Sequence, residues 1–267
     1  MPERNLKIAL IPLDIKLGES DENLETALER ISALDRDTDV AVLPEMFSTG
    51  YTTDRDALHA MAHESSDKTL NALMKWSSGS GIALAGTYLA TTETGVNNRA
   101  FFITPDGDRY FYNKRHLFTA GGEHKLVERG IDSPTIITYL GWKIRLSVCY
   151  DIRFPVWNRS AADGCDNHYD LLIVPANWPH SREYAWRHLL IARAIENLAF
   201  VAGCNREGED AYGVYEPGDS FVFNYWGKPI GTIEAQGTIY ATLDSEGMTA
   251  GRKRFPALND ADRFEIL

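Results

Sequence analysis

Cysteine is scarce in this chain of 267 residues, which has only Cys149, Cys165 and Cys204. Three cysteines cannot build a disulfide framework, and one stays free whichever pair forms, so the sequence favours a reducing compartment. The chain also lacks any apolar run close to the roughly 20 residues that span a bilayer. Its first residues lack the apolar segment and the small-residue cleavage site of a signal peptide. We therefore expect a cytoplasmic protein without a membrane segment.

Positive charge is also in short supply. The chain has 27 Lys and Arg against 38 Asp and Glu, which gives a formal net charge of -11. A field of that sign repels phosphate backbones and anionic lipids, so nucleic acid and membrane surfaces are excluded as expected partners. The 44% of hydrophobic residues is ordinary for a globular protein, and this excludes a disordered chain.

No internal repeat, Pro-rich linker or charge block divides the chain, so we predict one α/β domain over residues 1–267. From about residue 247 the tail is expected to be irregular. Ser20 is expected to cap the first helix, with apolar residues at helical spacing behind it. Further helices are expected at 67–77 and 182–197, and strands at 6–11, 39–45, 82–88, 99–104, 108–114, 143–149, 170–176, 199–204, 219–224, 228–233 and 238–243.

Cys149 lies at the carboxyl end of a predicted strand and is followed by a turn and Pro155, a residue suited to a first helical turn. This pattern predicts a thiol at a helix N-terminus, where the dipole lowers the thiol pKa and favours the reactive thiolate. Cys149 is therefore a candidate nucleophile. A buried structural cysteine is the alternative, because free cysteine is among the most buried residue types.

Two further charged residues end predicted strands. Glu45 closes an apolar strand, where desolvation would suit it to act as a general base. A helix-capping or solvated glutamate is the alternative. Lys114 ends a predicted hairpin strand, and with Arg115 and His116 behind it the segment by itself favours a solvated basic cluster over a functional site.

The combination of these residues is more specific than each alone. Glu45, Lys114 and Cys149 occur in this order within distinctive flanking segments, and the chain resembles the nitrilase, or carbon–nitrogen hydrolase, superfamily, whose triad is Glu–Lys–Cys. The matching segments are VLPEMFSTGY (42–51), YNKRHLF (112–118), LSVCYDIRFP (146–155), IVPANWP (173–179) and ARAIENLAFVAGCNR (192–206). The resemblance implies a four-layer αββα sandwich with mixed sheets, no cofactor, no metal, and a homo-oligomer that is at least a dimer.

The resemblance also implies a role for each triad residue. Cys149 attacks an amide carbonyl, and Glu45 carries protons to the departing ammonia and from the water that cleaves the thioester. Lys114 and the backbone N–H of Tyr150 stabilise the oxyanion. A second glutamate of the family helps to position the substrate, and Glu123 or otherwise Glu128 corresponds to it.

The flanks resemble the omega-amidase branch, which acts on 2-oxo acid monoamides such as 2-oxoglutaramate and 2-oxosuccinamate. Asn177 and Trp178 are expected to line the pocket. The carboxylate of such a substrate needs a cation, for which Arg182 and Arg115 are the candidates. Arg153 is expected to brace a helix start.

Other functions fit the same triad. A nitrilase, a carbamoyl amidase and a deaminated-glutathione amidase differ from an omega-amidase only in the pocket. A papain-like site with His116 as the base lacks a strand-end position for that histidine. A non-catalytic scaffold protein would have no reason to keep all three triad residues. His59 and His63 lack a third metal ligand nearby in the sequence, so a metal enzyme is not favoured.

Overall fold

A seven-stranded sheet forms one half of the core in the computed structural model, which describes residues 2–133, 135–161, 168–262 and 264. Its strand order is β13–β14–β1–β2–β3–β4–β5. Strands β1, β2 and β3 are parallel, whereas the other neighbours pair antiparallel. The strands are β1 (Leu6–Leu10), β2 (Val40–Val42), β3 (Ala83–Thr91), β4 (Val96–Ile103), β5 (Arg109–Asn113), β13 (Thr232–Ile233) and β14 (Ile239–Leu243).

The second sheet has five strands in the order β12–β9–β8–β7–β6. Its inner strands β7, β8 and β9 are parallel, and both edge strands pair antiparallel. A separate two-stranded hairpin, β10–β11, stands beyond it. The strands are β6 (Ile137–Tyr139), β7 (Trp142–Leu146), β8 (Leu171–Ala176), β9 (Phe200–Asn205), β10 (Gly208–Asp210), β11 (Gly213–Tyr215) and β12 (Phe221–Phe223). Both large sheets are therefore mixed, as predicted.

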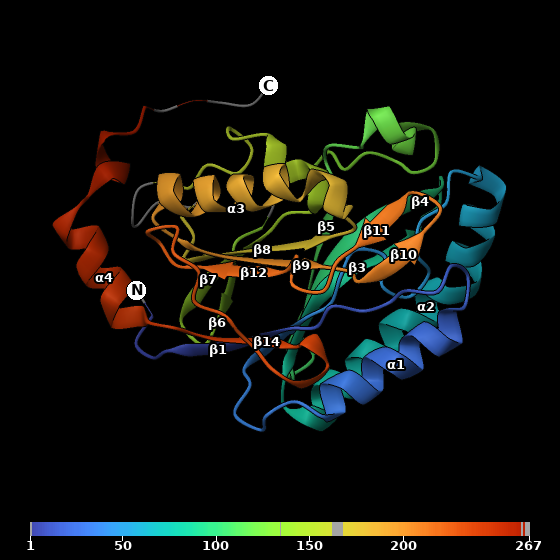
Figure 1. Cartoon of the computed structure of the whole chain (residues 1–267), viewed down its shortest axis with the longest axis horizontal. Coiled ribbons are helices and arrows are strands. Elements are labelled where there is room, and N and C mark those ends of the chain that lie inside the picture. The colour runs from blue at the N-terminus through green and yellow to red at the C-terminus, as the bar shows by residue number, and fades with distance from the viewer. Residues whose placement is uncertain (1, 134, 162–167, 263, 265–267) are drawn as a thin grey trace.

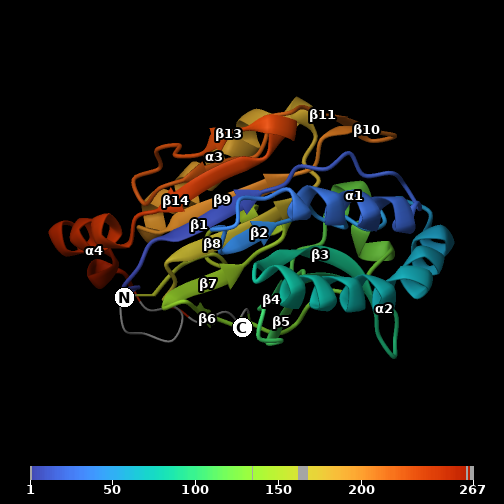
Figure 2. The same cartoon turned by 90° about the horizontal axis from the view of Figure 1, so that it is seen from below.

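Strand periodicity divides the core into layers. On β1, Ile8 and Leu10 belong to the cluster that joins the two sheets, whereas Ala9 and, just after the strand, Ile11 pack with the helices α1 (Ser20–Ser32) and α2 (Arg55–Ser80). Helix α3 (Glu183–Asn197) covers the outer face of the five-stranded sheet (Figure 1). Figure 2 shows α1 and α2 running across the outer face of the seven-stranded sheet. The predicted αββα sandwich is confirmed.

The first two helices differ from the prediction at their ends. Ser20 is the first residue of α1 rather than its cap, and no side chain caps this helix. Helix α2 begins twelve residues before the predicted 67, because the Asp54 side chain accepts hydrogen bonds from the backbone N–H groups of Asp56 and Ala57. The first turns of α2 are rich in polar residues, so their periodicity was too weak to indicate a helix.

The expectation of an irregular tail is wrong. Residues Ser245–Arg254 form the helix α4, whose cap is the side chain of Asp244, an acceptor for the N–H of Gly247. Glycine lowers helix propensity, which is why the sequence did not indicate a helix here. Gly251 is required by packing, since a Cβ at this position would lie 2.6 Å from the ring of Tyr225. The N-terminal segment lies beside α4 (Figure 1), and Asn5 accepts a hydrogen bond from the N–H of Ser245.

None of the helices within the described residues has the length and apolar character needed to cross a membrane.

Arg252 anchors α4 to the five-stranded sheet. Its guanidinium forms a buried ion pair with Asp170 at 2.6 Å and donates to the backbone carbonyls of Tyr169 and Leu198. Burial alone would raise the pKa of Asp170, but the hydrogen bond from His168 and the charge of Arg252 lower it below the usual 3.8. The stability that Asp170 contributes is therefore complete above that usual pKa and is lost as the pH falls below it.

We expect Arg252→Ala to lower the free energy of unfolding by about 3 kcal/mol, because it leaves a buried carboxylate without its charge partner. The acid dependence of stability should also become weaker. Urea denaturation at several pH values measures both effects. Lys253→Ala, at the exposed neighbouring position, is the control and should change stability by less than about 0.5 kcal/mol. Equal effects of the two substitutions would contradict this anchoring role.

Candidate active site

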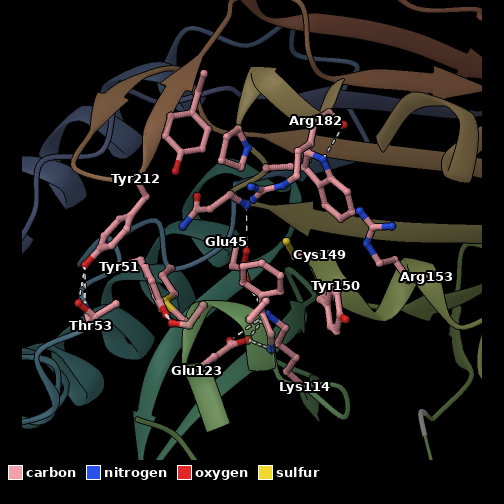
Figure 3. Close-up of a pocket in the computed structure, with 18 residues that line it drawn as sticks. Glu45, Tyr51, Thr53, Lys114, Glu123, Cys149, Tyr150, Arg153, Arg182 and Tyr212 are labelled. Atoms are coloured by element: carbon pink, nitrogen blue, oxygen red, sulfur yellow. Dashed lines mark hydrogen bonds and ion pairs between the residues drawn. The ribbon is translucent and has the colours of Figure 1, made fainter. Parts of the chain in front are cut away.

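A cavity of about 380 Å³ opens where strand ends of the two sheets meet (Figure 3). Glu45 follows β2 of the larger sheet, and Asn177 follows β8 of the smaller one. A backbone hydrogen bond of 3.5 Å from the N–H of Glu45 to the carbonyl of Ala176 joins the two ends. The cavity brings together most of the residues singled out in the sequence: Glu45, Lys114, Glu123, Cys149, Tyr150, Asn177, Trp178 and Arg182.

The Lys114 ammonium lies at the centre of a buried charge cluster. Its Nζ is 2.9 Å from Oε1 of Glu45 and 2.9 Å from each carboxylate oxygen of Glu123. All three side chains are at most 4% exposed. The residue follows β5, and its backbone N–H is fixed by the carbonyl of Asn98 on the neighbouring strand β4. Two carboxylates thus share one cation out of contact with water.

The Glu45 carboxylate is held on both of its oxygens. Oε1 accepts from Lys114 and from the side-chain amide of Asn98 at 2.7 Å, whereas Oε2 accepts from the backbone N–H of Asn177 at 2.9 Å. The next residue, Met46, has a φ of +48°, a left-handed conformation that turns the chain sharply after Glu45. The carboxylate therefore has a fixed orientation at the base of the cavity.

Cys149 lies on a strained turn. Strand β7 ends at Leu146, and Cys149, with a φ of +43°, begins a 3₁₀ helix that covers only Cys149–Arg153. The predicted strand to residue 149 and the predicted helix at Pro155 are therefore wrong. The left-handed conformation is the reason, because it ends the extended chain and turns the thiol into the cavity.

Asp151 stabilises this turn, although no pattern in the sequence indicated its importance. Its buried carboxylate accepts from the N–H of Val148, from the hydroxyl of Tyr112 and from the N–H of His116. The imidazole of His116 also contacts Asp151 at 2.7 Å and stacks on Phe154. The Asp151 carboxylate thus connects the turn that carries Cys149 to the segment that carries Lys114. It also binds the imidazole of His116.

The pKa values of Lys114 and Cys149 are both raised, but for different reasons. Burial alone would lower the pKa of Lys114, but the charges of Glu123 and Glu45 raise it well above its usual value, so the side chain stays cationic. Burial raises the pKa of the Cys149 thiol well above its usual value, and the charge of Glu45 adds to this effect. The expected lowering of the thiol pKa by a helix N-terminus is therefore wrong: the helix is a single short 3₁₀ segment, and desolvation dominates.

Two candidates from the sequence lie elsewhere. Arg115 turns away from the cavity, since its guanidinium donates to the carbonyl of Ile131 and packs on the ring of Trp157. Contrary to expectation, it is not positioned to meet a substrate carboxylate. The Glu128 carboxylate accepts from the hydroxyl of Thr92 at 3.1 Å, outside the charge cluster that contains Glu123.

Aromatic rings hold the two arginines of the cavity. The guanidinium of Arg182 lies over the ring of Phe118, and that of Arg153 lies over Trp178 at 4.8 Å from the ring centroid. Figure 3 shows the Arg182 side chain reaching over the cavity, whereas Arg153 lies to the side of Tyr150. No carboxylate of the described residues pairs with Arg182. A cation without an ion-pair partner therefore faces the opening.

The β10–β11 hairpin supplies a wall of the cavity that the sequence analysis missed, since its strands are short and polar. Tyr212, at its turn, donates from its hydroxyl to Oγ1 of Thr53 and accepts from the Thr53 N–H at 2.7 Å. The ring of Tyr51 packs edge-on against that of Tyr212. Tyr215 also lines the cavity. The alternation of tyrosine and glycine in this segment was the sequence pattern that could have indicated a hairpin here.

Comparison with known proteins agrees with this geometry. The model of the carbon–nitrogen hydrolase family matches residues 7–253. The chain belongs to the carbon–nitrogen hydrolase family. The family and the class of bond expected from the sequence are thereby confirmed.

Individual relatives of this carbon–nitrogen hydrolase cover nearly its whole length. The omega-amidase YafV of Escherichia coli K12 is 40% identical over 98% of both chains, and the 2-oxoglutaramate amidase of Bacillus subtilis is 31% identical over 95% of this chain and 96% of its own. Among solved structures, XC1258 from Xanthomonas campestris, a CN-hydrolase superfamily protein with an arsenic adduct in its active site, has a TM-score of 0.88. It is 34% identical and covers 99% of this chain and 100% of its own.

The other described cysteine and the histidines of the hydrolase form no metal-binding group. Cys204 is fully buried and its thiol donates to the carbonyl of Val42, whereas Cys165 lies outside the described residues. His59 contacts the carbonyl of Leu126 through Nε2. Within the described ranges, no three His, Cys, Asp or Glu side chains are grouped so that they could hold a metal ion.

We expect iodoacetamide to modify Cys149 in the folded protein while Cys204 stays unmodified, because only Cys149 lines the cavity. Since burial and Glu45 raise the thiol pKa, the alkylation rate should continue to rise as the pH passes 9.0, the usual value for a thiol. Mass spectrometry of digested samples over a pH series measures the rate. Cys149→Ala is the control, and a rate that reaches its plateau below pH 9.0 would contradict the raised pKa.

Proposed function

We propose that this protein is an omega-amidase that hydrolyses 2-oxo acid monoamides, such as 2-oxoglutaramate and 2-oxosuccinamate, to the 2-oxo acid and ammonia. The observation that carries the proposal is the buried cluster in which Lys114 bridges Glu45 and Glu123 beside the Cys149 thiol. The activities named for the Escherichia coli and Bacillus subtilis relatives support the substrate class. The cavity volume of about 380 Å³ suits a small linear amide.

In the first half of the reaction, Sγ of Cys149 attacks the amide carbonyl carbon while Glu45 accepts the thiol proton. The carbon–sulfur bond forms, and the carbonyl electron pair moves to oxygen. The Lys114 ammonium and the N–H of Tyr150 stabilise this oxyanion, a task for which the raised pKa of Lys114 suits it, because it stays charged throughout. Glu45 then gives the proton to the nitrogen, the carbon–nitrogen bond breaks, and ammonia leaves a thioester.

In the second half, water attacks the thioester carbonyl and Glu45 accepts its proton. When the second tetrahedral intermediate collapses, the carbon–sulfur bond breaks and the proton returns from Glu45 to Cys149. One water is consumed, and the products are a carboxylic acid and ammonia. The raised pKa of the Cys149 thiol supports this sequence, because such a thiol needs a base at the moment of attack and is reprotonated readily at the end.

The other cavity residues are assigned to substrate positioning. Glu123 fixes Lys114 through both of its oxygens and lies where it can also accept from the amide nitrogen of a substrate. The side-chain amide of Asn177 is buried at the cavity without a hydrogen-bond partner among the described residues, so it can bind polar substrate atoms. Trp178 and Tyr150 contribute apolar walls.

We assign the substrate carboxylate to Arg182. Its guanidinium lies over Phe118, it lines the same cavity as Cys149, and it has no ion-pair partner of its own among the described residues. A guanidinium is suited to a carboxylate because it can donate two parallel hydrogen bonds. This local cation offsets a net charge of -11, which would otherwise repel an anionic substrate.

We further propose that the protein works in the cytoplasm as at least a dimer. Among the described residues, Cys149 and Cys204 form no disulfide, which is consistent with a reducing compartment. Large apolar side chains are exposed along α3 and beside α4, with Tyr184 74%, Ile195 50% and Phe255 55% exposed. Apolar exposure of this kind supports a subunit contact through these helices. Analytical ultracentrifugation of the intact protein measures its mass in solution.

The function is tested with a panel of candidate substrates and a measurement of released ammonia. We expect rapid release from 2-oxoglutaramate and 2-oxosuccinamate, and slow release from nitriles, carbamoyl compounds and deaminated glutathione. Cys149→Ala should abolish release while circular dichroism shows an unchanged fold. A panel in which another compound class reacts fastest would refute the substrate assignment, and an active Cys149→Ala protein would refute the mechanism.

The carboxylate assignment is tested by comparing Arg182→Ala with Arg115→Ala. Loss of a hydrogen-bonded charge partner costs about 2 kcal/mol, so kcat/KM for 2-oxoglutaramate should fall about 30-fold in Arg182→Ala. An uncharged amide of the same length should be hydrolysed almost as before. Arg115→Ala, whose guanidinium lies outside the cavity, is the matched control and should match the unmodified enzyme. Equal losses with both substrates would contradict the role of Arg182.

A further inference from the structure

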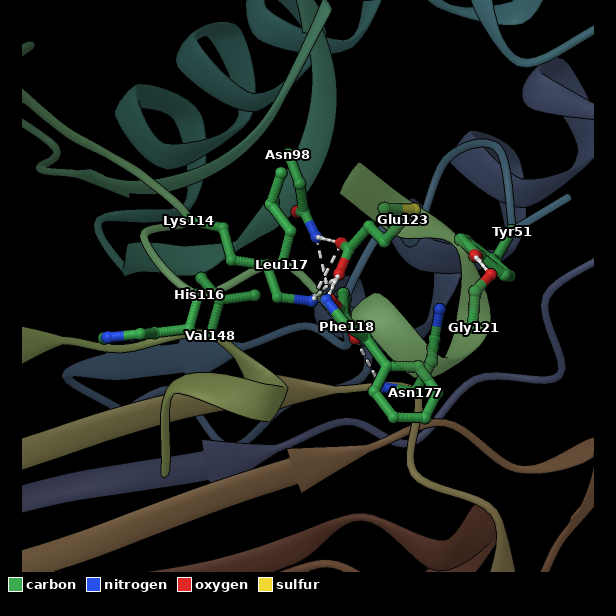
Figure 4. Close-up of polar contacts among 12 residues, drawn as sticks. Tyr51, Asn98, Lys114, His116, Leu117, Phe118, Gly121, Glu123, Val148 and Asn177 are labelled. Atoms are coloured by element: carbon green, nitrogen blue, oxygen red, sulfur yellow. Dashed lines mark hydrogen bonds and ion pairs between the residues drawn. The ribbon is translucent and has the colours of Figure 1, made fainter. Parts of the chain in front are cut away.

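Asn98 contacts both glutamates of the active site, although nothing in the sequence singled it out. It lies on β4 and is fully buried. Its Nδ2 is 2.7 Å from Oε1 of Glu45 and 3.4 Å from Oε1 of Glu123. Figure 4 shows its side-chain amide beside the Glu123 carboxylate and above the Lys114 ammonium. A single neutral side chain therefore joins the two carboxylates that share Lys114.

The chemistry of the contact fixes the orientation of the Asn98 amide. Ionised carboxylate oxygens only accept hydrogen bonds, so the NH₂ end of the amide must face Glu45 and Glu123, with one hydrogen available for each. The carbonyl end, Oδ1, then points the other way. It is buried and has no hydrogen-bond partner among the described residues. An unsatisfied buried acceptor costs stability, so this side chain serves the carboxylates at the expense of its own carbonyl.

The charges of the cluster explain why its carboxylates need a further hydrogen-bond donor. The cluster consists of two carboxylates, Glu45 and Glu123, and one ammonium, Lys114, and the protonated thiol of Cys149 lies beside it. The cluster therefore has an excess of one negative charge in a desolvated site. The second oxygens of Glu45 and Glu123 accept from the backbone N–H groups of Asn177 and Phe118. Their Oε1 atoms lie close to the same ammonium, and Asn98 is the neutral side chain that donates to both of them.

We propose that Asn98 is a positioning residue, which keeps Glu45 and Glu123 oriented around Lys114 and so holds the Glu45 carboxylate ready to accept the Cys149 proton. It acts through Glu45 and does not touch the substrate. The proposal rests on the proposed function insofar as Glu45 is the base of that reaction. Replacing Asn98 by an apolar side chain removes the unsatisfied Oδ1 together with the donor to the two carboxylates.

The test is Asn98→Leu, which keeps a similar volume and removes both ends of the amide. We expect kcat to fall about 100-fold, the size of loss that follows misplacement of a catalytic group, with little change in KM. The pH–rate profile should change as well, because Asn98 donates to the carboxylate that accepts the thiol proton.

Asn97→Leu is the matched control on the same strand. The side chain of Asn97 points to the opposite face of β4, and its Nδ2 donates to the backbone carbonyl of Glu128 at 3.0 Å. Asn97 is also buried, so the same substitution removes a buried hydrogen bond outside the charge cluster. We expect Asn97→Leu to lower the melting temperature and to leave kcat and the pH–rate profile unchanged.

The outcome that overturns the proposal is a folded Asn98→Leu protein with unchanged kcat and an unchanged pH–rate profile. If Asn98→Leu does not fold, Asn98→Ala takes its place, since it also removes the donor and a smaller side chain cannot clash. A folded Asn98→Ala protein with unchanged kcat overturns the proposal equally.

A second readout separates this proposal from the proposed function. Alkylation of Cys149 by iodoacetamide near neutral pH needs no amide substrate, but it still requires a base for the protonated thiol. We expect Asn98→Leu to slow this alkylation about 10-fold or more and Asn97→Leu to leave it unchanged. If no amide of the panel reacts with the unmodified protein, the proposed function fails, whereas slower alkylation in Asn98→Leu still supports the positioning role. An unchanged alkylation rate in Asn98→Leu refutes that role.

Discussion

The ammonium of Lys114, buried between two carboxylates, is the interaction on which the site depends. Taking three charges out of water is costly, and only close contacts with good hydrogen-bond geometry offset that cost. Both glutamates lie 2.9 Å from Nζ of Lys114, and each also accepts from a backbone N–H. Because every group is fixed by several neighbours, the carboxylate beside Cys149 cannot rotate freely. Preorganisation of this kind is what a general base needs.

The two-sheet sandwich places the Cys149 thiol next to this charge cluster. Glu45 follows a strand of the seven-stranded sheet, whereas Cys149 follows a strand of the five-stranded sheet. The apolar layer between the sheets holds the two strand ends at the same edge of the molecule. Asp151 adds a polar tie, since its carboxylate bonds both the cysteine turn and the segment of Lys114. The strained left-handed conformation of Cys149 persists because the surrounding structure fixes it.

The charge of the whole chain differs from the charge at the opening of the cavity. The chain as a whole is acidic, with a net charge of -11, and the buried cluster also carries more negative than positive groups. At the opening of the cavity the balance reverses, because Arg182 and Arg153 lie there on aromatic rings. In the proposed function, the carboxylate of the substrate binds at Arg182 and its amide end reaches the carboxylates of Glu45 and Glu123. The arrangement gives an amide with one charged end a single preferred direction in the cavity.

The sequence by itself indicated most of the strands and the three residues Glu45, Lys114 and Cys149, because strand periodicity and short motifs are local properties, but it missed β6, β10 and β11. The αββα sandwich was expected only from the resemblance to a known family. The sequence could not decide between Glu123 and Glu128 or between Arg182 and Arg115, since a sequence does not show which way each side chain points in the folded protein. It also misjudged the Cys149 thiol, whose pKa is raised by burial that only packing creates. Asn98, Asp151 and Tyr212 act through partners distant in the chain. Only the tertiary structure, which brings those partners into contact, decided their place.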